Sequence, residues 1–257
     1  MLIVISPAKT LDFETRIKTR KFTLPEFTAD AEILSGIMRK KKPHQLRKMM
    51  GISDALAELN HDRFQTWQTE HDDDNSRQAV LSFMGDVYTG LDATSLSSRD
   101  LEFAQKHLRI LSGLYGLLRP LDRMQPYRLE MGTALKNPRG KDLYAFWGDQ
   151  PTASLNAQAA QLRTRFLINL ASNEYFRAID KAELEPEIIT PIFKDRKGDK
   201  YKVLSFFAKK ARGMMARHVI KNRIRRPDGM RDFAEEGYRF NEEMSSDSEY
   251  VFTREQQ

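Results

Sequence analysis

Cysteine is absent from this chain of 257 residues. Disulfide bonds, thiolate metal sites, cysteine-held iron–sulfur clusters and thiol-based peroxidase or protease chemistry are therefore excluded. The five histidines are scattered and form no close pair of the zinc-binding kind. The acidic run that follows His71 is more typical of a solvated loop than of a cation site. We expect no metal and no cofactor, and a chain without disulfides fits a cytoplasmic setting best.

Long hydrophobic runs are also missing. The longest, such as Leu2–Ile5 and Phe166–Ile168, are far shorter than the roughly 20 residues that a membrane-spanning helix needs. The first residues lack both a charged segment and a cleavable apolar one, so we expect no signal peptide and no membrane contact. Apolar residues nevertheless make up 40% of the chain. That share is enough for a real core, and no linker divides residues 1–257, which predicts a single domain.

Motifs that would specify a reaction are missing as well. There is no glycine-rich dinucleotide loop and no serine in a nucleophile elbow. Ser6–Thr10 follows an apolar run and ends in Lys-Thr, as a P-loop does, but the glycines of a P-loop are absent. Asn169–Tyr175 also ends a predicted strand in polar residues, which is a common position for a site.

These strand ends leave a second interpretation open, namely an enzyme or an iron-handling protein with its site in a cleft. The candidate cleft residues are Ser6, Lys9, Thr10, Arg128, Glu130, Ser172, Asn173 and Glu174. Carboxylates there suit acid–base chemistry and helix capping equally well. Enzymatic activity therefore stays undecided, and the missing motifs weigh against it.

Positive charge is concentrated in one segment. Residues 194–226 contain 13 lysines or arginines and 2 acidic residues, a net charge of +11 in a chain whose total is +6. Such a concentration is typical of a surface that binds a polyanion. Residues 227–257 carry 9 acidic and 3 basic residues. This acidic segment either folds over the basic one and weakens its binding, or forms a solvated tail or a terminal strand.

The basic segment has two faces when it is read as a helix over Ser205–Ile224, with about 100° per residue. The apolar face, which should anchor the helix, contains Phe207, Ala208, Ala211, Met214, Met215 and Val219. Acidic residues are absent from Lys200 to Asp228, although solvated helices usually interleave acids with bases. This predicts a continuous cationic wall that binds a polyanion. Its residues are Lys209, Lys210, Arg212, Arg217, Lys221 and Arg223, joined by Arg225 and Arg226.

The turn Gly51–Ser53 is a second candidate phosphate contact. Leu46–Ala57 fits the helix-hairpin-helix pattern, except that Ser53 replaces the second glycine. Backbone N–H groups at such a hairpin can bind phosphate. The contact would involve Lys48, Gly51, Ile52 and Ser53, with further charge from Lys40, Lys41, Lys42 and Arg47. A helix–turn–helix packing corner with a glycine cap is an equally good interpretation.

Strands and helices mix along the chain without regular alternation, which predicts a mixed α/β (α+β) fold with a mixed sheet surrounded by helices. The predicted strands are Leu2–Ile5, Arg165–Leu170, Tyr250–Phe252, and a hairpin of Ile188–Phe193 with Tyr201–Phe206 that turns at Gly198. Helical spacing predicts Thr28–Lys41, one helix after Pro43, one after Gly51, Ser76–Met84 and Ser98–Leu111. Leu111–Pro120 resembles a hairpin between helices, and we expect the arginines that follow it to tie loops to carboxylates.

Several strings together resemble the YaaA family of bacterial peroxide-stress proteins. They are Ser-Pro-Ala-Lys-Thr (6–10), Leu-Ser-Gly-Leu-Tyr-Gly-Leu-Leu-Arg-Pro-Leu-Asp (111–122), Gln-Pro-Tyr-Arg-Leu-Glu-Met-Gly (125–132), Asn-Leu-Ala-Ser-Asn-Glu-Tyr (169–175) and Ala-Lys-Lys-Ala-Arg-Gly-Met-Met (208–215). The segments 85–90 and 140–147 fit it too, and the likeness runs from Met1 to Phe252.

The resemblance implies a cytosolic protein of the hydrogen peroxide response, linked to limiting unincorporated iron and so to DNA damage and its repair. It also implies a single mixed α/β domain with a positively charged cleft and a helix-hairpin-helix element that binds duplex or junction DNA. It supplies no catalytic set. We therefore predict sequence-independent binding of the DNA phosphate backbone, with weak self-association on DNA.

Overall fold

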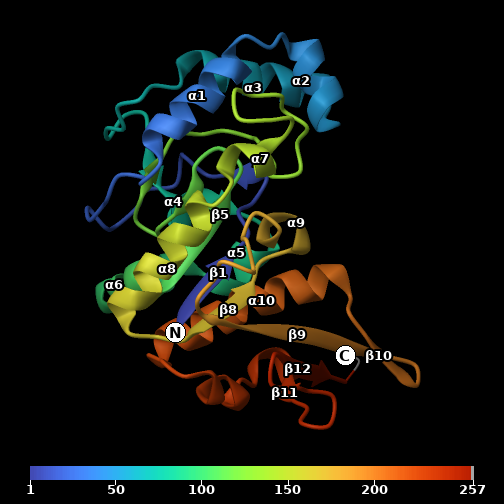
Figure 1. Cartoon of the computed structure of the whole chain (residues 1–257). Coiled ribbons are helices and arrows are strands. Elements are labelled where there is room, and N and C mark those ends of the chain that lie inside the picture. Colours follow the sequence, from blue (N-terminus) through green and yellow to red (C-terminus); the bar gives the residue numbers. More distant parts are fainter. Residues whose placement is uncertain (256–257) are drawn as a thin grey trace.

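A mainly parallel sheet forms the centre of the molecule, whose computed structural model describes residues 1–255 (Figure 1). Its strands are β1 (Leu2–Ile5), β5 (Leu108–Ser112), β6 (Gly116–Leu118), β8 (Phe166–Leu170), β9 (Glu187–Lys197), β10 (Lys200–Lys202), β11 (Arg239–Phe240) and β12 (Glu249–Arg254). The order is β11-β12-β9-β8-β1-β5-β6, and β10 pairs with β9. The central strands β5, β1, β8, β9 and β12 run parallel, whereas β6, β10 and β11 are antiparallel to their partners. The fold is thus the predicted mixed α/β single domain.

Strand β1 lies in the middle of the sheet. It pairs with β5 on one side, where Ile3 is opposite Leu108, and with β8 on the other, where Ile3 is opposite Ile168. All of its residues are buried, which explains why the strand is a continuous apolar run and shows no alternation. Because β1 and β8 are parallel neighbours, the polar residues that follow them emerge at the same edge of the sheet.

Helices surround this sheet. They are α1 (Thr28–Arg39), α2 (Pro43–Met50), α3 (Asp54–Thr66), α4 (Ala79–Ser82), α5 (Asp86–Leu91), α6 (Ser98–His107), α7 (Leu143–Trp147), α8 (Gln150–Leu162), α9 (Asn173–Phe176) and α10 (Ser205–Lys221), with the 3-10 helices η1 (Ala93–Ser95), η2 (Pro227–Asp232) and η3 (Glu235–Gly237). Helices α1, α2 and α3 lie together at one end of the molecule, and β9, β11 and β12 lie at the other (Figure 1). Within residues 1–255, no helix has the length and apolar character that crossing a membrane requires.

Most predicted strands are confirmed. The predicted Leu2–Ile5, Arg165–Leu170 and Tyr250–Phe252 correspond to β1, β8 and β12. The hairpin also forms, with Lys197 opposite Lys200 and Gly198 at a φ of 62°, although its second strand is only three residues long. The acidic segment that begins at residue 227 therefore contains a terminal strand, as one of the two interpretations of this segment predicted.

Two predicted helices are wrong in part. Segment 76–84 breaks into β3 (Arg77–Gln78), α4 and β4 (Phe83–Met84), because β3 pairs with β7 (Arg123–Met124) and β4 pairs with β2 (Thr10–Leu11). The predicted helix Ser98–Leu111 ends at His107, and the apolar run after it is β5. A strand that is buried on both faces has no period of two, so spacing alone does not separate it from the end of a helix.

The turn predicted between helices in Leu111–Pro120 is instead a β-hairpin between β5 and β6. Ser112 pairs with Gly116, which has a φ of 65°. A Cβ atom at Gly116 would lie 2.7 Å from the ring of Trp147. The second glycine of this string therefore provides a turn conformation and a close ring contact within the core.

Candidate nucleic-acid interface

The basic face of α10 is largely neutralised within the fold. Lys210 pairs with Glu236, and Arg217 pairs with Asp92 at 3.4 Å. Lys221 and Arg223 lie 3.2 and 2.7 Å from Asp100. The carboxylates come from η3, from the end of α5 and from α6, all distant in sequence. The predicted continuous wall of free cations is therefore not what the fold presents, and a role for these four residues in DNA binding stays a prediction.

Asp100 is the centre of this pairing. The residue is 3% exposed, and its carboxylate also accepts hydrogen bonds from the backbone N–H and the hydroxyl of Ser97 at 2.9 and 2.7 Å. Burial acts to raise the pKa of Asp100, but the hydrogen bonds from Ser97, Arg223 and Lys221 outweigh it and hold the pKa well below its usual range. Lys221 and Arg223 thus serve to dock α10 against α6.

Helix α10 also contacts α5 at very short range. A Cβ atom at Gly213 would lie 1.8 Å from the Val87 carbonyl oxygen, and one at Gly90 would lie 2.1 Å from the Lys210 carbonyl oxygen. The predicted apolar face is buried as expected at Ala208, Ala211, Met214, Met215 and Val219, but Phe207 is 39% exposed. The helix is an internal support of the fold more than an external wall.

Lys209 and Arg212 differ from the other cations of α10. Both line a cavity of about 410 Å³. Neither has an acidic partner within 4.0 Å among residues 1–255. Lys210, Arg217 and Lys221 of the same helix each have one. Burial lowers the pKa of the Arg212 guanidinium. A half-buried guanidinium without a carboxylate leaves its donors available to an anion.

The cavity lies at the carboxyl edge of β1 and β8, and the strand-end residues converge there. The Ser6 and Ser172 hydroxyl oxygens are 3.3 Å apart, and the Ser172 N–H donates to the Ser6 hydroxyl at 2.9 Å. The Lys9 ammonium lies 3.0 Å from the Glu130 carboxylate. Of the candidate cleft residues, the cavity lining includes Ser6, Lys9, Thr10, Glu130, Ser172 and Glu174.

The remaining two candidate cleft residues, Arg128 and Asn173, are not part of the lining. Arg128 donates to Glu130 at 3.0 Å, so Glu130 binds two cations of its own fold. Glu174 accepts from the Gly132 N–H at 2.9 Å. Both carboxylates of the candidate set therefore have internal partners. The lining also contains Asp86, which has no cation within 4.0 Å among residues 1–255, and Lys209 and Arg212 are its cations without an acidic partner.

Sequence reasoning did not single out Tyr88, which closes the cavity from α5. Its hydroxyl donates to the Ser6 carbonyl oxygen at 3.1 Å. Burial, helped by the neighbouring Tyr127, raises the pKa of Tyr88 well above its usual value. The phenol therefore stays protonated and fixes the loop that follows β1. The only sequence signal was the string 85–90, one of those that carry the family resemblance.

The predicted turn at Gly51–Ser53 joins α2 to α3. Gly51 has a φ of 62°, and its N–H donates to the Arg47 carbonyl oxygen. Ile52 is 8% exposed and packs into the core. The Ser53 hydroxyl accepts from the Leu56 N–H at 3.3 Å and so caps α3. The corner is well formed, and phosphate binding to its remaining N–H groups stays a prediction.

Cations gather around this corner without internal partners. Lys40, Lys42 and Lys48 are exposed, and within residues 1–255 none of them has a carboxylate within 4.0 Å. Arg47 differs, because it lies 3.3 Å from Asp54. Free positive charge thus remains at α2, away from the helix where the sequence concentrates it.

The two arginines added to the predicted wall lie beyond the end of α10. Arg225 and Arg226 are exposed, and the Arg225 backbone accepts a hydrogen bond from the Met1 ammonium at 3.0 Å. Arg225 therefore lies at the amino end of β1, whereas the cavity with Lys209 and Arg212 lies at the carboxyl end.

The acidic segment is part of the fold over residues 227–255. Glu236 pairs with Lys210, and β12 pairs with β9 over Glu249–Arg254. Removing the segment would take two strands from the sheet, so truncation would not separate competition for DNA from loss of structure.

Comparisons with known proteins assign the chain to a family. The family described as "Peroxide stress protein YaaA" matches residues 1–244. A UPF0246 protein of Paraburkholderia phytofirmans is 55% identical over 256 residues, covering 99% of this chain and 98% of the relative. A UPF0246 protein of Paraburkholderia xenovorans is 54% identical over the same length, with the same coverage.

Proposed function

The chain belongs to the YaaA family of peroxide stress proteins, and we propose that it acts in the peroxide response by binding the phosphate backbone of DNA without reading its sequence. The family supports the role in peroxide stress. The binding mode is inferred from the distribution of charge over the fold.

One observation carries the proposal, namely that the cavity and the α2–α3 corner both present cations without an acidic partner within 4.0 Å among residues 1–255. Among the described residues, Lys209 and Arg212 have no carboxylate within 4.0 Å, although two glutamates and Asp86 also line the cavity. Keeping a half-buried guanidinium unpaired costs free energy, and a bound anion removes that cost. Arginine donates two parallel hydrogen bonds to a phosphate, which makes Arg212 the best candidate for a fixed phosphate contact.

The paired cations of α10 would support this contact indirectly. Lys210, Arg217 and Lys221 are held by carboxylates of three other elements. Their ion pairs fix the helix that carries Lys209 and Arg212. Reversing their charge would therefore disturb the fold as well as any DNA contact, and such variants do not test DNA binding cleanly.

A better test uses the unpaired cations. Two variants are needed. The cleft variant combines Lys209→Gln with Arg212→Gln, and the α2 variant combines Lys40→Gln, Lys42→Gln and Lys48→Gln. We expect each variant to bind a fluorescent duplex about tenfold or more weakly than the wild type at low salt. Two duplexes of unrelated sequence should bind equally, because phosphate contacts carry no sequence information. A four-way junction of the same arm length adds a comparison of DNA shape.

The matched control removes two exposed cations of the loop between β2 and α1, by Lys18→Gln with Arg20→Gln. It lowers the net charge by the same amount as the Lys209/Arg212 double variant. Equal loss of affinity in this control and in the Lys209/Arg212 double variant would mean that only net charge matters. Full affinity in both cleft and α2 variants would reject the proposed interface.

A second candidate function is favoured by the convergence of Ser6, Ser172 and Glu130 in the cavity. A cavity of about 410 Å³ with hydroxyls, carboxylates and two unpaired cations also suits a small phosphorylated substrate. Thermal shift measurements with mononucleotides and with duplex DNA separate the two functions. Stabilisation by a mononucleotide that Ser6→Ala removes, with no DNA binding, would favour the enzyme.

A further inference from the structure

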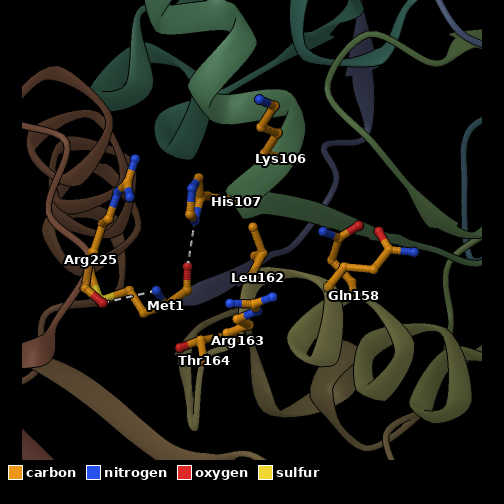
Figure 2. A pocket seen from close by; sticks show the side chains of 9 residues that line it. Met1, Lys106, His107, Gln158, Leu162, Arg163, Thr164 and Arg225 are labelled. Atoms are coloured by element: carbon orange, nitrogen blue, oxygen red, sulfur yellow. Dashed lines mark hydrogen bonds between the residues drawn. The ribbon is translucent and has the colours of Figure 1, made fainter.

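A second cationic cavity lies at the other end of β1, in a region that the proposed function does not use. Its volume is about 560 Å³. Its cations come from the last turn of α6, from the residue that follows α8 and from the loop that follows α10 (Figure 2). They are Lys106, Arg163 and Arg225, with His107 and the Met1 ammonium beside them.

Within the described part of the chain, the lining of this cavity contains cations and no acid. Among residues 1–255, none that lines the cavity is acidic, and Lys106, Arg163 and Arg225 have no acidic partner within 4.0 Å. The neutral polar lining consists of Gln158, Gln161 and Thr164, whose side chains can donate hydrogen bonds. Three cations in the lining of one cavity, with no acid beside them in that lining over residues 1–255, favour a bound anion.

The Met1 ammonium and His107 respond to the positive charge of Arg225. The Met1 ammonium donates to the Arg225 carbonyl oxygen at 3.0 Å, and the His107 Nδ1 donates to the Met1 carbonyl oxygen at 2.9 Å (Figure 2). Burial and the charge of Arg225 lower the pKa of the ammonium to about 6. Burial, and then the ammonium, Arg225 and Arg109, lower the pKa of His107.

Arg163 has an unusual backbone conformation. It ends α8 at a φ of 50° and a ψ of 45°, the left-handed region in which glycine is the common residue. A side chain there is strained, and strain of this kind is often retained where the side chain has a function. Arg163 lines the cavity, so the strained position is also the one that contributes a cation.

We propose that this cavity binds a small phosphorylated anion, with Arg163, Arg225 and Lys106 as its charged ligands and the diphosphate group as the recognised unit. Apart from the buried His107, no aromatic ring lines the cavity to stack on a base, so the site recognises the phosphates and not a nucleobase. The site is separate from the proposed DNA cleft, because the two cavities lie at opposite ends of β1.

Isothermal titration calorimetry with inorganic pyrophosphate tests the proposal, using the full chain in phosphate-free buffer at low salt. The informative variant is Arg163→Gly, which relieves the left-handed strain while it removes the cation. We expect its melting temperature to equal or exceed that of the wild type, and its affinity for pyrophosphate to fall about tenfold or more. ADP should bind like pyrophosphate, and adenosine should not bind.

Arg165→Gln provides the matched control, because Arg165 is exposed, lies two residues away and does not line the cavity. It should bind pyrophosphate as the wild type does, and Arg163→Gly should bind duplex DNA as the wild type does. Wild-type affinity of Arg163→Gly for pyrophosphate would overturn the proposal. Loss of pyrophosphate binding in the variant that combines Lys209→Gln with Arg212→Gln would also overturn it, because the anion would then bind in the cleft.

Discussion

At the scale of single residues, Asp100 joins two parts of the chain that are distant in sequence. It accepts from Ser97 at the start of α6, and it binds Lys221 and Arg223 at the end of α10. Its side chain is 5% exposed, whereas those of the two cations are 46% and 38% exposed. The partly exposed cations limit the strength of each pair, and the shared buried carboxylate makes the cluster cooperative.

Asp100→Asn should destabilise the protein by about 2 kcal/mol, because two charge-assisted hydrogen bonds are lost while the cap is partly kept. Urea denaturation measures the change in the free energy of unfolding. The control is Asp54→Asn, which breaks the exposed pair with Arg47 and should cost less than about 0.5 kcal/mol. Equal losses in both variants would show that Asp100 is not a structural centre.

The difference between wild type and Asp100→Asn should depend on pH. The folded pKa of Asp100 lies below the unfolded value of about 4, so its contribution is fully present above that value. It should be lost progressively as pH falls below about 4 towards the folded pKa. Unfolding curves at several pH values would measure this, and a difference that grows on acidification would contradict the assignment.

The pairing of the cations could not be predicted from local sequence. Lys221 and Asp100 are 121 residues apart, and no acid lies between Lys200 and Asp228 to suggest a partner. The sequence correctly indicates that the charge is concentrated. Which cations stay free depends on the acidic residues that the sheet topology brings to α10.

At the scale of elements, the contact between α10 and α5 depends on two glycines. Gly213 and Gly90 let the backbones of these helices approach where any Cβ atom would overlap a carbonyl oxygen. This contact fixes the position of Arg212, the residue before Gly213, at the cavity.

Gly213→Ala should therefore destabilise the protein by at least about 3 kcal/mol, or prevent folding, despite the better helix propensity of alanine. The matched control is Gly36→Ala within α1, where a Cβ atom would meet nothing within 4 Å. That variant should be stabilised by up to about 1 kcal/mol. Thermal unfolding of both variants gives the comparison, and a neutral Gly213→Ala would mean that the two helices can move apart.

Elements with a clear pattern were predictable, and those set by pairing were not. The apolar runs of β1 and β8 and the glycine turn of the β9–β10 hairpin are local signals, and they gave correct strands. The passage from α6 into β5 has no local signal, because Leu108–Ser112 is apolar enough for either structure. Leu108–Ser112 forms a strand because it pairs with β1.

At the scale of the whole molecule, β1 links two cavities with different chemistry. The one at its carboxyl end combines hydroxyls, carboxylates and the unpaired Lys209 and Arg212. The one at its amino end is lined by cations without acids. Strand topology explains why the first could be predicted in outline, since the carboxyl ends of parallel neighbours meet at one edge. The second joins α6, the end of α8 and the end of α10, which no sequence pattern connects.

The central claim is that DNA phosphates bind to the unpaired cations of the cleft and of the α2–α3 corner, and the salt dependence of duplex binding tests it most directly. The logarithm of the association constant should fall linearly with the logarithm of salt concentration, by about 0.9 for each phosphate contact. In Lys209→Gln with Arg212→Gln the slope should become shallower by about two contacts, whereas Lys18→Gln with Arg20→Gln should leave it unchanged. A wild-type slope near zero, or the same slope in the cleft variant, would contradict the account.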